Sequence, residues 1–230
     1  MSAQTMIRRK PEVEYPDSDG QPMSDNTLQF QWIVTLQGGL DALFRDDPNV
    51  FVAGDLLWYP VEGDNTVRAA PDVMVVFGRP KGYRGSYKQW DEDGIAPQVV
   101  FEVLSPNNRV REMVAKFQFY DRFAVEEYYL FDPDRIDLSG WIRRGDDLVE
   151  IVQADGWTSP RLGVRFDLSS GNLQVFAPDG RPFATYVELV EQRECERQQA
   201  QQEHQRAQQE HQRAERLAAQ LRALGVEPND

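Results

Sequence analysis

The chain has 230 residues and a formal net charge of −13, from 25 basic and 38 acidic side chains. Forty per cent of the residues are hydrophobic, and 12 Phe, 8 Tyr and 5 Trp can build a substantial core, which excludes a chain disordered throughout. An acidic balance argues against a surface that binds a polyanion over its whole extent, because phosphate contacts need Lys and Arg. A local basic groove in an acidic shell stays compatible with this charge.

Cysteine and histidine are rare in this sequence. The single cysteine, Cys195, cannot form an internal disulfide, and no Cys/His cluster indicates zinc. His204 and His211 lie in a repetitive C-terminal stretch, which excludes a His-based catalytic triad in the folded part. The N-terminus has no signal-peptide pattern, and no segment reaches the roughly 18 apolar residues of a membrane span. We therefore expect a soluble, cytoplasmic protein without membrane association.

The order of the predicted elements indicates one mixed domain. Residues 1–23 mix charge, Pro and Gly without a period and predict a disordered leader. Ser24, Asp25 and Asn26 offer N-cap side chains for a first helix, which carries Gly38 and Gly39. A second helix is expected over 109–123, and strands over 50–58, 73–77, 99–104, 127–131, 140–143, 148–152, 164–167 and 173–176. Residues 24–184 thus predict an α/β domain with helices on a central sheet and a β-rich C-terminal part.

Two further segments have patterns of their own. The polar stretch 78–94 alternates cations with Tyr and Trp, as nucleic-acid contacts often do, although such a loop is as often simply exposed. The tail over 185–230 repeats QQEHQRA at 201–207 and 208–214. One heptad position takes Ala200, Ala207 and Ala214, but the other takes Glu203 and Glu210, which is poor coiled-coil chemistry. A solvated helix and a weakly self-associating coil both fit the tail.

Three charged residues occupy positions where a charge is costly. Asp72 opens the apolar strand 73–77, and Glu102 interrupts the apolar strand 99–104. Two carboxylates on neighbouring strands would make an oxygen site suited to Mg²⁺ or Mn²⁺, which could activate water at a phosphate. Lys116, on the following helix, could add a positive charge at the reacting phosphate. The bland alternatives are a strand cap for Asp72, a structural Glu102–Lys116 ion pair, and a surface pair of Lys116 with Glu112.

These residues stand in an order that resembles the PD-(D/E)XK nuclease superfamily, in particular a restriction-endonuclease-like branch catalogued as a domain of unknown function. The resemblance covers roughly residues 25 to 180. It rests on four segments: Pro71-Asp72, Glu102-Val103-Leu104-Ser105-Pro106, Glu112-x-x-x-Lys116-x-x-x-Tyr120, and Val125-Glu126-Glu127-Tyr128-Tyr129. It implies a restriction-endonuclease-like fold, with a mixed central sheet flanked by helices, a β-rich C-terminal part and a C-terminal helical tail.

The resemblance also implies roles for individual residues. Asp72 and Glu102 would be ligands of Mg²⁺ or Mn²⁺, with the carbonyl of Val103 as a third ligand. The usual lysine position, two residues after the glutamate, is Leu104, so Lys116 would take that role. Many members have a glutamate in the first helix. Residues 28–40 have no acid, so Gln31 or Gln37 would have to serve there.

The leading interpretation is a metal-dependent endonuclease that hydrolyses phosphodiester bonds in DNA, with Asp72, Glu102 and Lys116 as its catalytic residues. Because many nucleases of this fold act as dimers, we expect a homodimer. The alternative is a non-catalytic protein of the nuclease fold that associates with partners through its helical tail. We expect Ser105 to cap the second helix, since no histidine is available to activate it, and Tyr120 to belong to the core.

Overall fold

The computed structural model describes residues 13–20 and 22–223. It divides into two compact units, residues 1–183 and 184–230. The first unit contains a six-stranded sheet in the order β1-β3-β5-β6-β7-β8. All neighbouring strands run antiparallel except β5 and β6, which are parallel and joined through α2. The domain is therefore of the mixed α/β class that the order of elements predicts.

The bounds of the elements agree closely with the sequence pattern along the central strands. The main sheet consists of β1 (Val50–Gly54), β3 (Val73–Phe77), β5 (Val99–Val103), β6 (Glu127–Asp132), β7 (Asp137–Arg144) and β8 (Asp147–Glu150). Two small ladders join β2 (Trp58–Tyr59) with β4 (Tyr87–Lys88) and β9 (Arg165–Asp167) with β10 (Gln174–Phe176). The helices are α1 (Thr27–Leu43), α2 (Val110–Arg122) and α3 (Tyr186–Ala223), with a short 3-10 helix at Gln89–Glu92.

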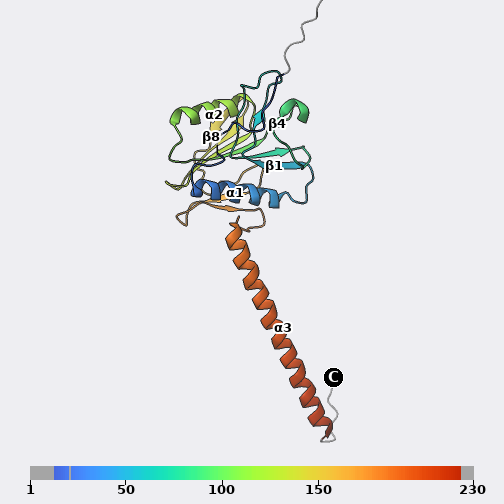
Figure 1. The fold of residues 1–230 in the computed structure, drawn as a ribbon. Coiled ribbons are helices and arrows are strands. Elements are labelled where there is room, and N and C mark those ends of the chain that lie inside the picture. The colour runs from blue at the N-terminus through green and yellow to red at the C-terminus, as the bar shows by residue number, and fades with distance from the viewer. Residues whose placement is uncertain (1–12, 21, 224–230) are drawn as a thin grey trace, which may run out of the picture. The chain divides into compact units, whose positions relative to one another are not determined.

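The two helices of the domain lie on opposite faces of the sheet (Figure 1). Strand alternation sends Val73, Val75 and Phe101 toward α1, where they join Ile33 and Leu36 in one apolar core. The alternate residues of β3, β5 and β6 form a second core with α2, which contains Met74, Val76, Val100, Tyr120 and Tyr128. Asp72 and Glu102 have the same parity as this second set. The α2 face is therefore the one that receives the two acids.

Helix α1 begins as the sequence predicts, because the Asn26 side chain accepts a hydrogen bond from the Gln29 backbone N–H at 2.8 Å.

Only one of the two glycines of α1 has a structural explanation. A Cβ on Gly39 would collide with the Phe183 ring, whereas a Cβ on Gly38 would meet nothing. Gly39 therefore allows the end of the domain to pack closely against α1.

Three expectations about the domain are corrected. The strand predicted over 50–58 breaks at Asp55, whose backbone is left-handed at φ 47°, so β2 forms a separate ladder. The polar stretch 78–94 is not one open loop, because it contains β4 and the 3-10 helix.

The third correction concerns residues 13–20 of the predicted disordered leader over 1–23. Residues 1–12 and 21 lie outside the described residues, whereas residues 14–16 pack on the domain. The Pro16 carbonyl accepts a hydrogen bond from the Tyr59 hydroxyl at 2.7 Å, and the Tyr15 ring lies between Tyr59 and Trp90.

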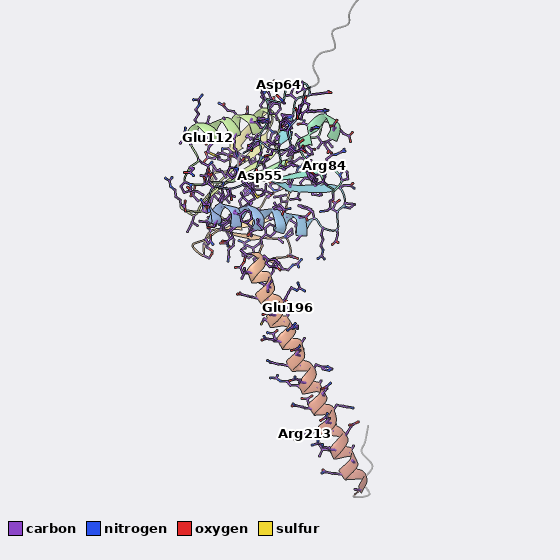
Figure 2. All side chains as sticks on the ribbon, in the orientation of Figure 1. Asp55, Asp64, Arg84, Glu112, Glu196 and Arg213 are labelled. Atoms are coloured by element: carbon purple, nitrogen blue, oxygen red, sulfur yellow. The ribbon has the colours of Figure 1, made fainter. Side chains whose placement is uncertain are left out.

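The second unit is built around one helix of 38 residues, α3. Thr185 and Glu188 form a reciprocal cap at its start, with the Glu188 carboxylate accepting from the Thr185 N–H at 2.7 Å. Nearly all described side chains of α3 are exposed, and they project around the helix, as those of Glu196 and Arg213 do (Figure 2). The structure agrees with a solvated helix, and self-association of the tail stays a prediction. None of the described helices combines the length and the apolar character needed to cross a membrane.

Candidate active site

Asp72 and Glu102 lie on neighbouring strands, on the α2 face of the sheet. Asp72 immediately precedes β3 and is 7% exposed, and Glu102 lies within β5 and is 3% exposed. The Asp72 carboxylate accepts a hydrogen bond from the Val103 backbone N–H at 2.6 Å, which links the two strand ends. The three sequence-predicted residues Asp72, Glu102 and Val103 are thus brought together.

Helix α2 supplies two groups that contact Glu102. The Lys116 ammonium donates to Oε2 of Glu102 at 2.6 Å, and the Tyr120 hydroxyl donates to Oε1. The pair of Lys116 with Glu112 that the sequence allowed is absent from the described contacts. Glu112 is exposed on α2 and accepts instead from the Arg109 backbone N–H at 3.2 Å (Figure 2). Tyr120 is buried in the core as expected, and its hydroxyl is a contact of the site that sequence reasoning missed.

The electrostatics of this group reflect two acids held close together in a buried place. Burial, and then the charge of Glu102, raise the pKa of Asp72 well above its usual range. Burial alone would lower the pKa of Lys116, but the charges of Glu102 and Asp72 outweigh it, so the net direction is upward. Lys116 is therefore a cation at neutral pH, and a further positive charge beside Asp72 would oppose the effects of burial and of Glu102 that raise the pKa of Asp72.

The site opens to solvent through a pocket of about 520 Å³, which we call the carboxylate pocket. Asp72 and Lys116 line it, whereas Glu102 lies behind them. Three further acids line the same pocket: Asp19, Asp25 and Asp55. Burial, and then the charge of Asp19, raise the pKa of Asp55. Because Arg68 and Lys116 are the pocket's basic residues, the pocket is acidic overall and would repel a phosphate unless cations entered with it.

The first helix contributes a glutamine, but not one of the two expected. Gln31 is exposed on α1, whereas Gln29 is buried and donates from Nε2 to the Val103 carbonyl at 2.8 Å. Gln29 Oε1 also accepts from the Asp25 backbone N–H at 2.8 Å. Gln29 is therefore the α1 glutamine that contacts Val103, and a role for Gln31 or Gln37 stays a prediction. The position of Gln29 at the start of the helix, near the strand ends, is the sequence feature that could have identified this contact.

Ser105 does not cap α2, because the N-cap residue is Arg109. The Ser105 hydroxyl donates to the Asp25 carboxylate at 2.5 Å, and its N–H donates to the Asn108 side chain at 2.6 Å. Ser105 therefore ties the end of β5 to the start of α1 beside the carboxylate pocket. As the composition required, residues 24–184 contain no histidine that could activate Ser105.

The cations of the stretch 78–94 are largely neutralised by acids of the domain itself. Arg79 and Arg84 both bind Glu92, with N–O distances of 2.9 and 2.5 Å. Lys81 binds Asp41 at 2.9 Å. The Lys88 ammonium lies 5.5 Å from the centre of the Tyr15 ring. These contacts favour a structural role for the stretch over the nucleic-acid contact that its composition suggested.

The described residues offer an oxygen donor set for a divalent cation that is limited to two carboxylates. No group of three or more His, Cys, Asp or Glu side chains that could bind one metal ion occurs within residues 13–20 and 22–223. Asp72, Glu102 and the Val103 carbonyl remain, and each oxygen has lone pairs beyond its present hydrogen bonds. Mg²⁺ commonly takes one or two carboxylates and fills its remaining positions with water and phosphate oxygens, so this set fits such an ion.

Comparison with known proteins gives one family and one similar fold. A family model described as "Uma2: Putative restriction endonuclease" matches residues 4–220. Among solved structures, the chain is similar to a putative nuclease of Anabaena variabilis ATCC 29413 that belongs to DUF820. The identity is 14% and the TM-score 0.46, over 60% of this chain and 75% of the other. A search of the curated proteins gave no match.

Proposed function

Because this chain belongs to the Uma2 family of putative restriction endonucleases, we propose that it is a metal-dependent endonuclease that hydrolyses phosphodiester bonds in DNA. One observation carries the proposal beyond the family. Asp72, Glu102 and Lys116, which come from three separate segments, lie together on the α2 face of the sheet, and Asp72 and Lys116 line the carboxylate pocket. A domain needs no such costly assembly of buried charge for stability alone.

In this proposal Asp72 and Glu102 bind Mg²⁺ or Mn²⁺, and the Val103 carbonyl is a third ligand. The ion would supply positive charge at the phosphate and lower the pKa of a bound water. The raised pKa of Asp72 supports this assignment, because burial and the charge of Glu102 disfavour a negative charge on Asp72 and a bound cation would stabilise that charge. Glu102 would keep the Tyr120 hydroxyl as a partner and exchange part of its contact with Lys116 for the metal.

Lys116 lines the carboxylate pocket with a positive charge beside the proposed metal ligands. Its side chain is 31% exposed, so its ammonium can reach a substrate as well as Glu102. An ammonium there would neutralise charge that develops on the phosphate oxygens as water attacks. The Gln29–Val103 hydrogen bond positions the proposed carbonyl ligand and takes no direct part in the reaction.

The direct test is cleavage of supercoiled plasmid and of single-stranded DNA with Mg²⁺ or Mn²⁺. Asp72→Asn keeps the acceptor for Val103 N–H but removes the charge, and Lys116→Gln removes the ammonium. Arg144→Gln, at an exposed position at the end of β7, is the matched loss of one positive charge. We expect nicking that needs the metal, is lost in the first two variants and is retained in the third.

Two results would contradict the proposal: no cleavage by the parent protein on any DNA offered, or equal cleavage by all four preparations. Either result would favour the alternative, a non-catalytic protein of the nuclease fold that associates with partners through α3. We further propose that the protein acts in the cytoplasm as a homodimer. Deleting residues 190–230 and measuring the mass in solution tests whether α3 contributes to such a dimer.

A further inference from the structure

A second pocket of about 540 Å³ lies on the other side of α2, between this helix and the strands β6 and β7. Its walls are apolar and aromatic: Val110, Val114, Phe117 and Trp141. Val110 and Val114 are 82% and 49% exposed, so the entrance carries apolar surface in contact with water. The volume lies in the range of about 300–1,000 Å³ that is common for small-molecule sites. We call it the aromatic pocket.

The inner wall of the aromatic pocket contains a polar atom without a partner. Tyr128 lines the pocket and is 1% exposed, and its hydroxyl forms no hydrogen bond among the described residues. A buried hydroxyl without a partner is unfavourable, and proteins rarely leave one so. Burial, and then the charge of Glu102, raise the pKa of Tyr128, so the hydroxyl keeps its proton and is available as a donor. The hydroxyl has almost no accessible surface, so a ligand in this pocket would have to displace the side chains that cover it before it placed an acceptor there.

The mouth of the aromatic pocket carries carboxylates, which restricts the charge of the ligand. Asp132 and Asp134 line it together with Arg135, and Arg135 lies 3.7 Å from the Asp132 carboxylate. These acids would repel a phosphate, whereas they could accept hydrogen bonds from an amino group. The ligand that satisfies all of these conditions is an uncharged planar ring with polar atoms at its edge.

The aromatic pocket is also adjacent to the carboxylate pocket. Asn108 lines both, and Leu104 and Ser105, which line the aromatic pocket, directly follow Val103. A nucleotide bound with its phosphate at Lys116 would therefore have its neighbours within reach of the aromatic pocket. We propose that the aromatic pocket binds one unstacked nucleobase of the nucleic acid, between Val114, Phe117 and Trp141, with the Tyr128 hydroxyl as hydrogen-bond donor. This inference rests on the proposed function for the identity of its ligand.

The test uses the four uncharged nucleosides adenosine, guanosine, cytidine and thymidine with the full chain in EDTA, and detects binding by saturation-transfer NMR and calorimetry. Tyr128→Phe removes only the unpartnered hydroxyl, and Val114→Phe fills the pocket at a half-exposed position. Val149→Phe makes the same change at an exposed position of β8, outside the pocket, and is the matched control.

We expect at least one nucleoside to bind the parent protein and the Val149→Phe variant alike. Tyr128→Phe should weaken binding about three- to tenfold, the range for one hydrogen bond, and Val114→Phe should abolish it. Tyr128→Phe should at the same time unfold at a denaturant concentration no lower than the parent, because it loses no partner. A hydroxyl with a purely structural role would not combine weaker binding with unchanged stability.

The inference is overturned if none of the four nucleosides binds, or if the two pocket variants bind as the parent does. These results do not depend on metal or cleavage, so they separate the inference from the proposed function. Nucleoside binding without DNA cleavage would keep the aromatic pocket as a nucleobase site and remove the nuclease assignment. Cleavage without nucleoside binding would keep the nuclease assignment and remove the nucleobase site.

Discussion

Glu102 and Glu127 are two buried glutamates on adjacent parallel strands, and they face opposite sides of the same sheet. Glu127 is 1% exposed and accepts hydrogen bonds from the Tyr129 hydroxyl, the Ser159 hydroxyl and the Arg161 backbone N–H. Glu102 is 3% exposed and accepts from Lys116 and Tyr120. Burial and hydrogen bonding therefore do not distinguish Glu102, the proposed functional acid, from Glu127.

What distinguishes Glu102 is its surroundings. A second carboxylate, Asp72, lies close enough to have its pKa raised by Glu102, and a pocket opens beside the pair. Glu127 has no such pocket among those described, and its partners fasten the segment around Ser159 to the sheet. We infer that Glu102 is the functional acid because a like charge and a solvent path accompany it, whereas Glu127 accepts hydrogen bonds from two hydroxyls and a backbone N–H.

The largest effect on stability is expected at Glu127, the structural glutamate of the two. Glu127→Ala removes the common acceptor of two hydroxyls and one backbone N–H, so all three donors lose their partner. Each unsatisfied buried donor costs about 1–3 kcal/mol, so the free energy of unfolding should fall by about 3 kcal/mol or more. Urea denaturation measures this loss. A change below about 1 kcal/mol would show that the Glu127 network is not structural.

The next largest loss of stability is expected at Tyr120 and Tyr129, the tyrosines that donate to the two glutamates. Tyr120→Phe and Tyr129→Phe each remove one hydroxyl that donates to a buried carboxylate, and each should cost about 1.5–3 kcal/mol of stability. Only Tyr120→Phe should also reduce DNA cleavage per folded molecule, because only Tyr120 contacts Glu102. Equal reductions in cleavage, measured under conditions where both variants are folded, would contradict the division of roles.

Asp72→Asn is expected to stabilise the metal-free protein. Burial, and then Glu102, raise the pKa of Asp72 in the folded state above its ordinary value. An acid with such a shift makes folding less favourable once the pH exceeds its unfolded pKa, and makes no difference below it. In EDTA near pH 7 the variant should therefore be more stable by about 0.5–2 kcal/mol. The gap should close as the pH falls to about 4. A parent that is more stable than Asp72→Asn at neutral pH would contradict the assigned direction.

The smallest effect is expected at the cation-rich stretch 78–94. Lys81→Gln should leave the salt dependence of DNA binding almost unchanged, because Asp41 already neutralises Lys81. If Lys81 contacted a phosphate, its replacement would reduce the magnitude of the slope of log affinity against log salt by about 0.9. A slope reduced by that amount would restore the nucleic-acid role that the composition of the stretch suggested.

The sequence predicted those features that depend on local pattern. The strand after Pro71, the acid inside β5 and the cap of α1 at Asn26 follow from alternation and side-chain chemistry, and the structure contains all three. The features it did not predict depend on contacts between distant segments. The Gln29–Val103 hydrogen bond joins residues 74 positions apart, and the Ser105–Asp25 hydrogen bond joins residues 80 apart.

The structural role of Glu127 was missed for the same reason. The sequence places Glu127 at the start of the predicted strand 127–131, and only the return of residues 159–161 to this strand shows that Glu127 is buried. Similarly, Arg79 and Arg84 look available for phosphate in the sequence, whereas Glu92 binds both in the fold. Charge pairing across turns is set by tertiary packing, which no periodicity records.

The most direct test of the account is to compare Glu102→Gln with Glu127→Gln in one assay. Each substitution neutralises one buried glutamate and keeps its size. The rate of Mg²⁺-dependent DNA cleavage is measured per folded molecule, with the folded fraction taken from urea denaturation. We predict that Glu102→Gln loses cleavage by about 100-fold or more, while Glu127→Gln is less stable yet cleaves at the parental rate. Equal cleavage by the two variants, or loss only in Glu127→Gln, would contradict it.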